Sequence, residues 1–330
     1  MSATTAPHHS AVDPGAASSA LDPATVDLSV SLAGAHMANP ITTASGCFAS
    51  GQEIDRFFDI AELGAIVCKS ITLEPREGLM TPRMHETPSG MLNAIGLQNP
   101  GVDAWIEQDL PWLQDKGVPV IVSIAGKTVD EFRIVAEKLR GLANIAALEV
   151  NLSCPNVAHR GLVFACQPGP SEAVIKAVRA VADVPIFGKL TPDVTDIAEI
   201  ARAVMDAGAD GLSLINTTLG MAVDPETGRP RIRNTVGGMS GPAVRPIAVR
   251  AIHQVHQARP EAPIIGMGGV RTVEDVVEMV RVGATAVAVG TATFADPMAT
   301  QRLVRELRSW LAARGFASIA ELRGTVQPWS

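Results

Sequence analysis

Lysine, asparagine and serine residues stand where several apolar segments of this 330-residue chain end. Lys69 and Ser70 close one such segment, Asn151 closes another, and Lys189 lies in a third. Lysine and asparagine are poor strand residues, so their repeated placement at strand ends needs a reason. A lysine within a buried strand must be paired or neutral. These residues could therefore bind a polar ligand, and the alternative is a structural ion pair with an acid such as Glu149.

Two glycine-rich turns indicate an anion site in the C-terminal third of the chain. Gly-Met-Gly-Gly at 266–269 leads into a helical pattern that starts at Thr272, and Val-Gly-Thr at 289–291 leads into another short helical segment. Glycines allow a ligand to approach the backbone, and N–H groups at helix starts attract anions. The loops after the last two strands of a β/α barrel form a recurrent phosphate site. Tight turns that simply require glycine are the alternative.

The four cysteines, Cys47, Cys68, Cys154 and Cys166, are scattered along the chain. None forms a C-x-x-C pair, so the sequence encodes neither a zinc site nor an iron–sulfur cluster. Cys154 follows a predicted strand and precedes Pro155. A thiolate there could act as a base or a nucleophile, whereas a small buried apolar residue is the alternative. Four separate thiols indicate a reducing cytoplasm.

The composition indicates a globular protein rather than a binder of nucleic acid or membranes. Hydrophobic residues make up 47% of the chain, and the formal net charge is −7. Phosphate backbones and anionic lipids require a basic face, which this balance does not favour. No apolar run approaches the roughly 18 residues of a membrane span. Residues 1–25 lack the pattern of a secretory signal and are expected to form a disordered tail before a single domain, 26–330.

The elements that must position these residues alternate between strands and helices. Eight apolar or β-branched segments are predicted strands: 41–45, 65–70, 120–125, 147–152, 185–190, 211–216, 264–268 and 286–291. Helical patterns lie between them at 171–181, 195–207 and 272–282, the second with Thr195 as its N-cap. The α/β alternation predicts a parallel sheet, and eight strands match a closed (β/α)8 TIM barrel, with a doubly wound sheet as the alternative. Residues 26–37 are predicted to form a small N-terminal hairpin that closes the barrel floor.

Several motifs in one order resemble the dihydroorotate dehydrogenase family from about residue 28 to 325. They are Lys69-Ser70, the loop 90–101, Asn-Leu-Ser-Cys-Pro-Asn at 151–156, Leu-Ile-Asn-Thr at 214–217, Gly-Gly-Met-Ser-Gly-Pro-Ala at 237–243 and Gly-Met-Gly-Gly at 266–269. A cysteine at 154 resembles the soluble class 1 enzymes, and residues 86–101 resemble the NAD-linked class 1B. The resemblance implies oxidation of (S)-dihydroorotate to orotate in de novo pyrimidine biosynthesis, with electrons passed to NAD⁺ through a partner subunit.

The resemblance also implies where ligands bind, with one FMN per chain and no metal. The flavin would be held by Ser45, Lys69, Ser70, Ser123, Asn151, Lys189, Ile215 and Gly241, and its phosphate by Gly268, Gly269, Gly290 and Thr291. Dihydroorotate would be held by Lys69, Asn93, Ala94, Ile95, Gly96, Leu97, Asn151, Asn216 and Thr217. Cys154 would take the C5 proton while the C6 hydride passes to the flavin. Four positions depart from the family pattern without removing a catalytic group: Cys68, Ser123, Gly188 and Asp193.

The route of the electrons implies a partner. No G-x-G-x-x-G fingerprint opens a βαβ unit for NAD⁺ here, and the cysteines are not clustered for an iron–sulfur cluster. The resemblance implies a homodimer of this chain with two electron-transfer subunits that carry FAD and a [2Fe–2S] cluster. The alternatives are a fumarate-using class 1A enzyme, a dihydropyrimidine-oxidising relative, a non-redox barrel for a phosphorylated ligand, and a degenerate binding subunit. Retention of Cys154, Lys69 and Lys189 together argues against the last.

Overall fold

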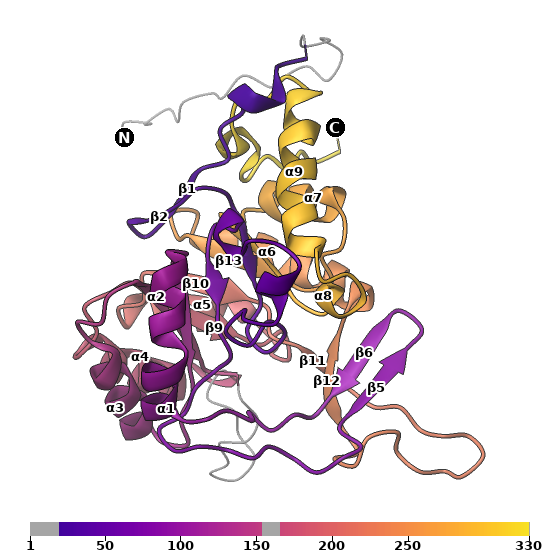
Figure 1. Cartoon of the computed structure of the whole chain (residues 1–330). Helices are drawn as coiled ribbons and strands as arrows, with labels where there is room; N and C mark the ends of the chain where they lie inside the picture. Colours follow the sequence, from indigo (N-terminus) through magenta and orange to yellow (C-terminus); the bar gives the residue numbers. More distant parts are fainter. Residues whose placement is uncertain (1–19, 154–165, 330) are drawn as a thin grey trace, which may run out of the picture.

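A computed structural model of the chain describes residues 20–153 and 166–329 (Figure 1). Its centre is an eight-stranded sheet in the order β3-β14-β13-β10-β9-β8-β7-β4, in which each named pairing is parallel. The strands are β3 (Ile41–Thr43), β4 (Ile66–Val67), β7 (Val120–Ile124), β8 (Ile145–Asn151), β9 (Ile186–Leu190), β10 (Gly211–Leu214), β13 (Ile264–Met267) and β14 (Ala286–Val289). All eight predicted strands are confirmed, mostly with shorter bounds.

The two end strands of this sheet, β3 and β4, meet and nearly close it into a barrel. Thr42 forms a parallel bridge with Ala65, and its hydroxyl donates to the Ala65 carbonyl oxygen at 2.8 Å. The Val67 amide donates to the Thr43 hydroxyl at 2.9 Å. Threonine hydroxyls thus replace part of the backbone ladder at this seam. The sheet is therefore a (β/α)8 barrel and not the doubly wound alternative, because an open sheet would leave its end strands apart.

Side chains alternate between the inside and the outside of the barrel, as they do in any strand. One apolar cluster fills the interior with residues of different sizes, including Ala147, Phe187, Ile265 and Ala286. A larger cluster lies between the strands and the surrounding helices. The interior is therefore a packed core rather than a pore, and a ligand must bind at one end of it.

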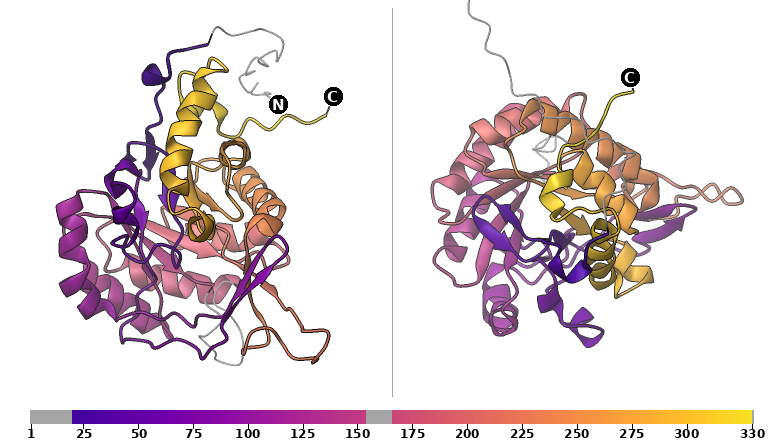
Figure 2. Two further views of the ribbon diagram at one scale, coloured as in Figure 1. Left: turned by 45° about the vertical axis from the view of Figure 1, so that its right-hand side comes forward. Right: turned by 90° about the horizontal axis from the view of Figure 1, so that it is seen from above.

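Helices surround the barrel, as the view from above shows (Figure 2). They are α1 (Val102–Gln108), α2 (Leu110–Lys116), α3 (Val129–Leu139), α4 (Pro168–Arg179), α5 (Ile197–Asp206), α6 (Arg245–Ala258), α7 (Val273–Arg281), α8 (Ala292–Ala295) and α9 (Ala299–Ala312). Short 3₁₀ turns are η1 (Pro23–Thr25), η2 (Ile54–Arg56), η3 (Ile60–Glu62), η5 (Pro242–Val244) and η6 (Ile319–Leu322). Within the described ranges, none of these helices has the length and apolar character needed to cross a membrane.

Of the three predicted helix starts, one is confirmed and two differ from the prediction. Thr272 caps α7 and forms a capping box with Asp275. Helix α5 begins one residue later than expected, because Asp196 rather than Thr195 is its N-cap. The Asp196 carboxylate accepts hydrogen bonds from two backbone amides, at 2.8 and 3.2 Å. Helix α4 begins three residues before the predicted start, with Pro168 in its first turn, where the missing N–H costs nothing.

The predicted N-terminal hairpin is present at the floor of the barrel. Strands β1 (Val30–Leu32) and β2 (Ala35–Met37) pair in antiparallel fashion. Their turn lines a shallow depression together with Pro119 and Pro185, which precede β7 and β9. Residues 1–19 of the expected tail lie outside the described residues. The boundary expected at residue 25 falls within a packed segment, because Leu21 packs against the core and its amide donates to Ala312 at 2.9 Å.

A second, four-stranded antiparallel sheet lies at the opposite end of the barrel from the hairpin (Figure 1). Its order is β11-β12-β6-β5, with β5 (Met84–Thr87), β6 (Gly90–Asn93), β11 (Thr218–Gly220) and β12 (Gly237–Ser240). The sequence had not predicted these strands, and residues 90–93 were expected to belong to a loop. This small sheet joins a segment that follows β4 to one that follows β10, and both segments carry predicted site residues.

Candidate active site

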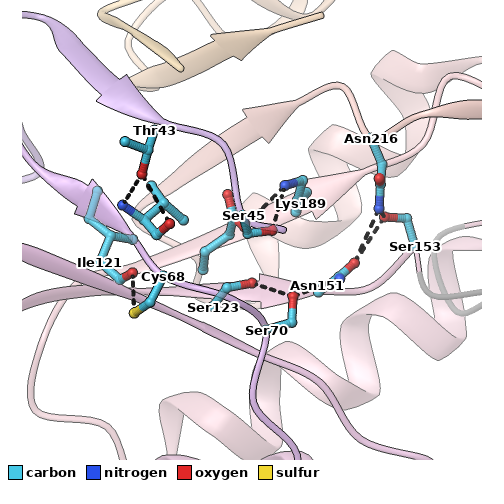
Figure 3. Close-up of polar contacts among 12 residues, drawn as sticks. Thr43, Ser45, Cys68, Ser70, Ile121, Ser123, Asn151, Ser153, Lys189 and Asn216 are labelled. Carbon is cyan, nitrogen blue, oxygen red and sulfur yellow. Dashed lines mark hydrogen bonds and ion pairs between the residues drawn. The ribbon is translucent and has the colours of Figure 1, made fainter. Parts of the chain in front are cut away.

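The C-terminal ends of the barrel strands, called the barrel mouth below, bring most of the predicted polar residues together (Figure 3). Lys189 lies on β9 and faces the interior of the barrel, because Ile186, Gly188 and Leu190 on the same strand face outward. Its ammonium lies 3.2 Å from the Ser45 hydroxyl and 3.2 Å from Glu149 Oε1. The predicted alternative, a structural ion pair with Glu149, is therefore present. The same ammonium also reaches the mouth, and its predicted role in binding a ligand stays a prediction.

Lys69 reaches the mouth by leaving the barrel ladder. The Cys68 amide still donates to the Ile121 carbonyl oxygen of β7 at 3.2 Å, but the Lys69 amide donates to the Ala49 carbonyl oxygen instead, at 3.0 Å. Pairing resumes only at Ile71, which bridges to Ile124. A Cβ built on Gly46 would lie 3.9 Å from the Lys69 ammonium nitrogen, which places this charge beside the loop that carries Ser45. The strand predicted at 65–70 is therefore interrupted at the residues expected to bind a ligand.

A second set of polar contacts connects β7, β8 and β10 across the mouth. The Ser70 and Ser123 hydroxyls lie 2.8 Å apart, and the Asn151 amide donates to Ser70 at 3.2 Å. Ser153 donates to Asn151 Oδ1 at 3.1 Å. The Asn216 amide donates to Asn151 Oδ1 at 3.3 Å and also to the Ser153 hydroxyl. Figure 3 shows this chain of contacts, which fixes the orientation of both asparagine side chains.

The small sheet brings the predicted substrate loop beside the end of β10. Asn93 is paired with Gly238 in the β6–β12 register and donates to its carbonyl oxygen at 3.3 Å. A Cβ on Gly238 would lie 2.1 Å from the Thr217 hydroxyl oxygen, so only glycine permits this approach. The Thr217 amide in turn donates to Asn216 Oδ1 at 2.8 Å. Asn93, Asn216 and Thr217 thus form one side of the mouth.

Backbone geometry fixes the rest of the predicted substrate loop. Gly96 has a φ of +77°, and a Cβ there would lie 2.8 Å from the Leu79 amide nitrogen. Leu97 also has a positive φ, of +57°. Three hydrogen bonds of 2.7–2.9 Å hold the loop in place. The Ala94 amide donates to the Arg83 carbonyl oxygen, and the Leu79 amide donates to the Ile95 carbonyl oxygen. The Asn99 side-chain amide donates to the Leu97 carbonyl oxygen.

Glycine backbones form a tight cradle on another side of the mouth. Gly241, Gly268 and Gly269 have φ values of +94°, +127° and +79°. A Cβ on Gly269 would lie 2.8 Å from the Gly241 carbonyl oxygen, and a Cβ on Gly268 would lie 3.6 Å from a side-chain carbon of Ile215. Ile215 itself is buried and follows β10. Such a cradle brings backbone groups within reach of a phosphate.

The last strand adds the predicted residues Gly290 and Thr291 to this region. Gly290 follows β14, and a Cβ there would lie 3.4 Å from Ala44 and 3.5 Å from the Cys47 sulfur. Thr291 is the residue that precedes α8, and both residues are partly exposed. The loop after β3 and the loop after β14 are therefore neighbours, as expected for adjacent strands of a barrel.

The thiols of Cys47 and Cys68 remain protonated at neutral pH. Burial raises the pKa of Cys47 to about 11, although Lys189 and Lys69 act in the opposite direction. Burial also raises the pKa of Cys68 to about 12, and its sulfur lies 3.5 Å from the Ile121 carbonyl oxygen. Neither thiol can serve as a base at neutral pH. Cys154, the predicted base, lies outside the described residues.

Three residues of the site were not predicted to be part of it. Ser153 lies within the motif at 151–156, and its spacing of two from Asn151 was the available signal. Glu149 was considered only as a structural partner, yet it contacts Lys189 directly. Gly238 gave no signal of its own, because its role depends on a contact with Thr217 that arises only in the folded chain.

Comparisons with known proteins all point to one family. A family model described as dihydroorotate dehydrogenase matches residues 27–311. The catalytic subunit of dihydroorotate dehydrogenase B (NAD(+)) from Geobacillus kaustophilus is 51% identical over 297 residues, which cover 90% of this chain and 95% of that protein. The subunit of the same name from Anoxybacillus flavithermus is 50% identical, with the same coverage. The one from a Geobacter species is 48% identical over 301 residues, which cover 91% of this chain and 98% of that protein.

Proposed function

This chain belongs to the dihydroorotate dehydrogenase family, and we propose that it oxidises (S)-dihydroorotate to orotate in pyrimidine biosynthesis as an FMN-dependent catalytic subunit. The observation that carries the proposal is the meeting of Lys189, Asn151 and Asn216 with the glycine cradle at one mouth. These groups come from separate strands; Lys189 and Asn151 are buried, and Asn216 is half-buried. Such a convergence is typical of a ligand site in a β/α barrel.

The residues present fit FMN. A Cβ on Gly241, Gly268 or Gly269 would lie under 3.0 Å from a neighbouring protein atom, so only glycine lets these turns pack this closely. Turns of this kind can present backbone N–H groups to a phosphate. Gly290 and Thr291 extend this cradle, while Ile215 offers an apolar surface to the ring system. Ser45, Lys69, Ser70, Ser123, Asn151 and Lys189 would hold the polar edge of the ring. Bound FMN supplies the two-electron acceptor for the oxidation.

The substrate carboxylate and ring amides match the other side of the mouth. Lys69 would pair with the carboxylate, whereas Asn93, Asn151, Asn216 and Thr217 would hold the ring. The loop Ala94, Ile95, Gly96 and Leu97 would cover the substrate and exclude water. In this assignment Cys154 removes the C5 proton of dihydroorotate as the C6 hydride departs to the acceptor.

Electrons must then leave the chain. Relatives are called catalytic subunits of an NAD(+) enzyme, which supports a separate electron-transfer subunit. We assign FAD and a [2Fe–2S] cluster to that subunit, and expect a dimer of this chain with two copies of it.

The visible spectrum of the purified chain tests the proposal. The protein as purified, or after addition of FMN, should absorb near the wavelengths of bound flavin. Anaerobic dihydroorotate should bleach this band, and orotate should accumulate in equal amount. A protein that binds no flavin even with FMN added, or whose bound flavin stays oxidised with dihydroorotate, would rule the proposal out.

A further inference from the structure

A buried carboxylate lies directly below Lys189 inside the barrel. Glu149 is on β8 and faces the interior, in register with Phe187, two residues before Lys189 on β9. The Lys189 and Glu149 side chains are 4% and 0% exposed, and the ammonium lies 3.2 Å from Glu149 Oε1. Within residues 20–153 and 166–329, Glu149 Oε2 has no hydrogen-bond partner. One oxygen of the carboxylate is therefore satisfied and the other is not.

Stability does not explain this pair. Removing a carboxylate and an ammonium from water costs several kcal/mol per ion, and their attraction offsets that cost only when every lone pair is satisfied. An apolar pair of similar volume is often as stable or more stable. The neighbouring interior residues Ala147, Phe187 and Ala286 are apolar, so this part of the barrel could have accepted one. The half-satisfied carboxylate therefore points to a role in the site.

The geometry also shows what Glu149 does to Lys189. The ammonium is held at two points, by Glu149 on β8 and by Ser45 in the loop after β3. Ser45 lies at the mouth, whereas Glu149 lies one layer deeper. The negative charge is thus placed behind the ammonium as seen from the mouth, where it opposes the positive potential that Lys189 presents to a ligand.

We propose that Glu149 is a positioning residue that acts through Lys189 and sets how strongly the site favours reduced over oxidised FMN. The inference rests on the proposed function. Lys189 attracts the extra negative charge of reduced FMN, and Glu149 moderates that attraction while it holds the ammonium in place. Without the carboxylate charge, the site should bind reduced FMN more tightly relative to oxidised FMN.

The test measures the Kd of oxidised FMN divided by the Kd of reduced FMN. This ratio is obtained from the midpoint potential of the holoenzyme. In Glu149→Gln the ratio should rise about tenfold, equivalent to about 30 mV for a two-electron couple, with the potential shifted in the positive direction. Glu149→Asp keeps the charge but withdraws it by one methylene, so the shift should have the same sign and be smaller. This second variant keeps the test open if the Gln variant does not fold.

Two further variants separate a role through Lys189 from other roles. Glu172→Gln removes an exposed carboxylate that pairs with Lys176 on α4, and it should leave the potential unchanged. In a Lys189→Met background, Glu149→Gln should change the ratio by less than about threefold, because its target is gone. An equal shift in both backgrounds would show that Glu149 acts on the flavin by itself and would overturn the inference.

The remaining outcomes are also decisive. An unchanged potential, or a negative shift, in folded Glu149→Gln that contains FMN would overturn the inference. If the wild-type flavin is reduced by dihydroorotate in the same experiment, that result leaves the proposed function intact. If the wild-type flavin binds but is not reduced by dihydroorotate, the proposed function fails instead.

Discussion

At the scale of single residues, Ser153 connects two asparagines that are assigned to the substrate. Its hydroxyl donates to Asn151 and accepts from Asn216, so each asparagine presents a defined face to the mouth. Asparagine can donate from nitrogen and accept through oxygen, and without such contacts either face could turn toward a ligand. A residue with no assigned contact to substrate thus determines which groups the substrate meets.

The first prediction follows from this connection. Ser153→Ala should raise KM for dihydroorotate about tenfold, because the loss of the two hydrogen bonds is equivalent to about 1–1.5 kcal/mol. Flavin content should stay at the wild-type level. Thr300→Val is the control, since the Thr300 hydroxyl on α9 is buried without a partner in the described part of the chain. Steady-state kinetics with an artificial acceptor measure both, and an unchanged KM in Ser153→Ala would contradict the role.

The second prediction concerns Cys154, whose role comes from the resemblance and the family. Cys154→Ala should bind FMN and orotate normally but reduce the flavin about 10²-fold more slowly or worse, as expected for loss of a general base. Cys154→Ser should retain some activity that rises with pH, because a hydroxyl is a weaker acid than a thiol. Stopped-flow reduction under anaerobic conditions gives the rates. Wild-type rates in the alanine variant would remove Cys154 from the mechanism.

Lys189 shows what sequence reasoning can and cannot resolve for one residue. A lysine in a buried strand requires a partner, which correctly indicated either Glu149 or a ligand. The two possibilities were treated as alternatives; the structure shows the ion pair with Glu149, and the ligand role stays a prediction. Spacing along one strand specifies the direction of a side chain, but its contacts on neighbouring strands depend on the register between β8 and β9.

At the scale of elements, the start of α5 gives the third prediction. Asp196→Ala should lower the free energy of unfolding by about 1 kcal/mol, because the side chain accepts hydrogen bonds from the Ala198 and Glu199 amides. Thr195→Ala at the neighbouring exposed position should change it by less than about 0.5 kcal/mol. Denaturant titration measures both. Equal losses in the two variants would favour Thr195 as part of the cap.

The fourth prediction concerns Gly241, which packs closely against Gly90 of the small sheet. This residue directly follows β12 and has a φ of +94°, and a Cβ there would lie 2.5 Å from the Cα of Gly90. Gly241→Ala should therefore displace the cradle and reduce the FMN content of purified protein by about tenfold or more, given the strain of both backbone and contact.

A matched control isolates the contact from the backbone strain. Gly34 has the same φ of +94°, but a Cβ there would meet no atom within 4 Å. Gly34→Ala should therefore lower stability by about 1 kcal/mol and leave FMN content unchanged. The ratio of flavin to protein absorbance reports occupancy. Full occupancy in Gly241→Ala would remove this glycine from the cofactor site.

The same small sheet marks the limit of prediction at this scale. The eight barrel strands are continuous apolar runs, which is why the sequence identified all of them. Strands β11 and β12 are three and four residues long and contain three glycines between them, which weakens any strand signal. Asn93 and Gly238, which pair across β6 and β12, are 145 residues apart in the chain. A pairing of this kind is determined by the folded barrel, not by local pattern.

At the scale of the whole molecule, fold and family follow from different kinds of evidence. The strand count and the glycine turns predict the barrel and place the mouth at the strand ends. The chemistry does not follow from them, because the same barrel supports many reactions. It was the order of several motifs, such as the one at 151–156, that specified dihydroorotate oxidation, and the matching of residues 27–311 to that family agrees.

The fifth prediction is that this chain needs a partner to reduce NAD⁺. A bound flavin that accepts electrons must release them before the next turnover. The sequence contains neither a dinucleotide-binding fingerprint nor clustered cysteines for a relay, and we have assigned its Gly-Met-Gly-Gly turn at 266–269 to the proposed FMN site. The isolated chain should therefore oxidise dihydroorotate with dichloroindophenol as acceptor but form no NADH.

Co-expression with an FAD and [2Fe–2S] subunit should restore NADH formation and yield a larger complex on size exclusion. The Glu172→Gln chain provides a control, because Glu172 pairs with Lys176 on α4 and is none of the residues assigned to the site. Robust NADH formation, or efficient reduction of fumarate, by the isolated chain would mean that the electrons leave by a route that needs no partner.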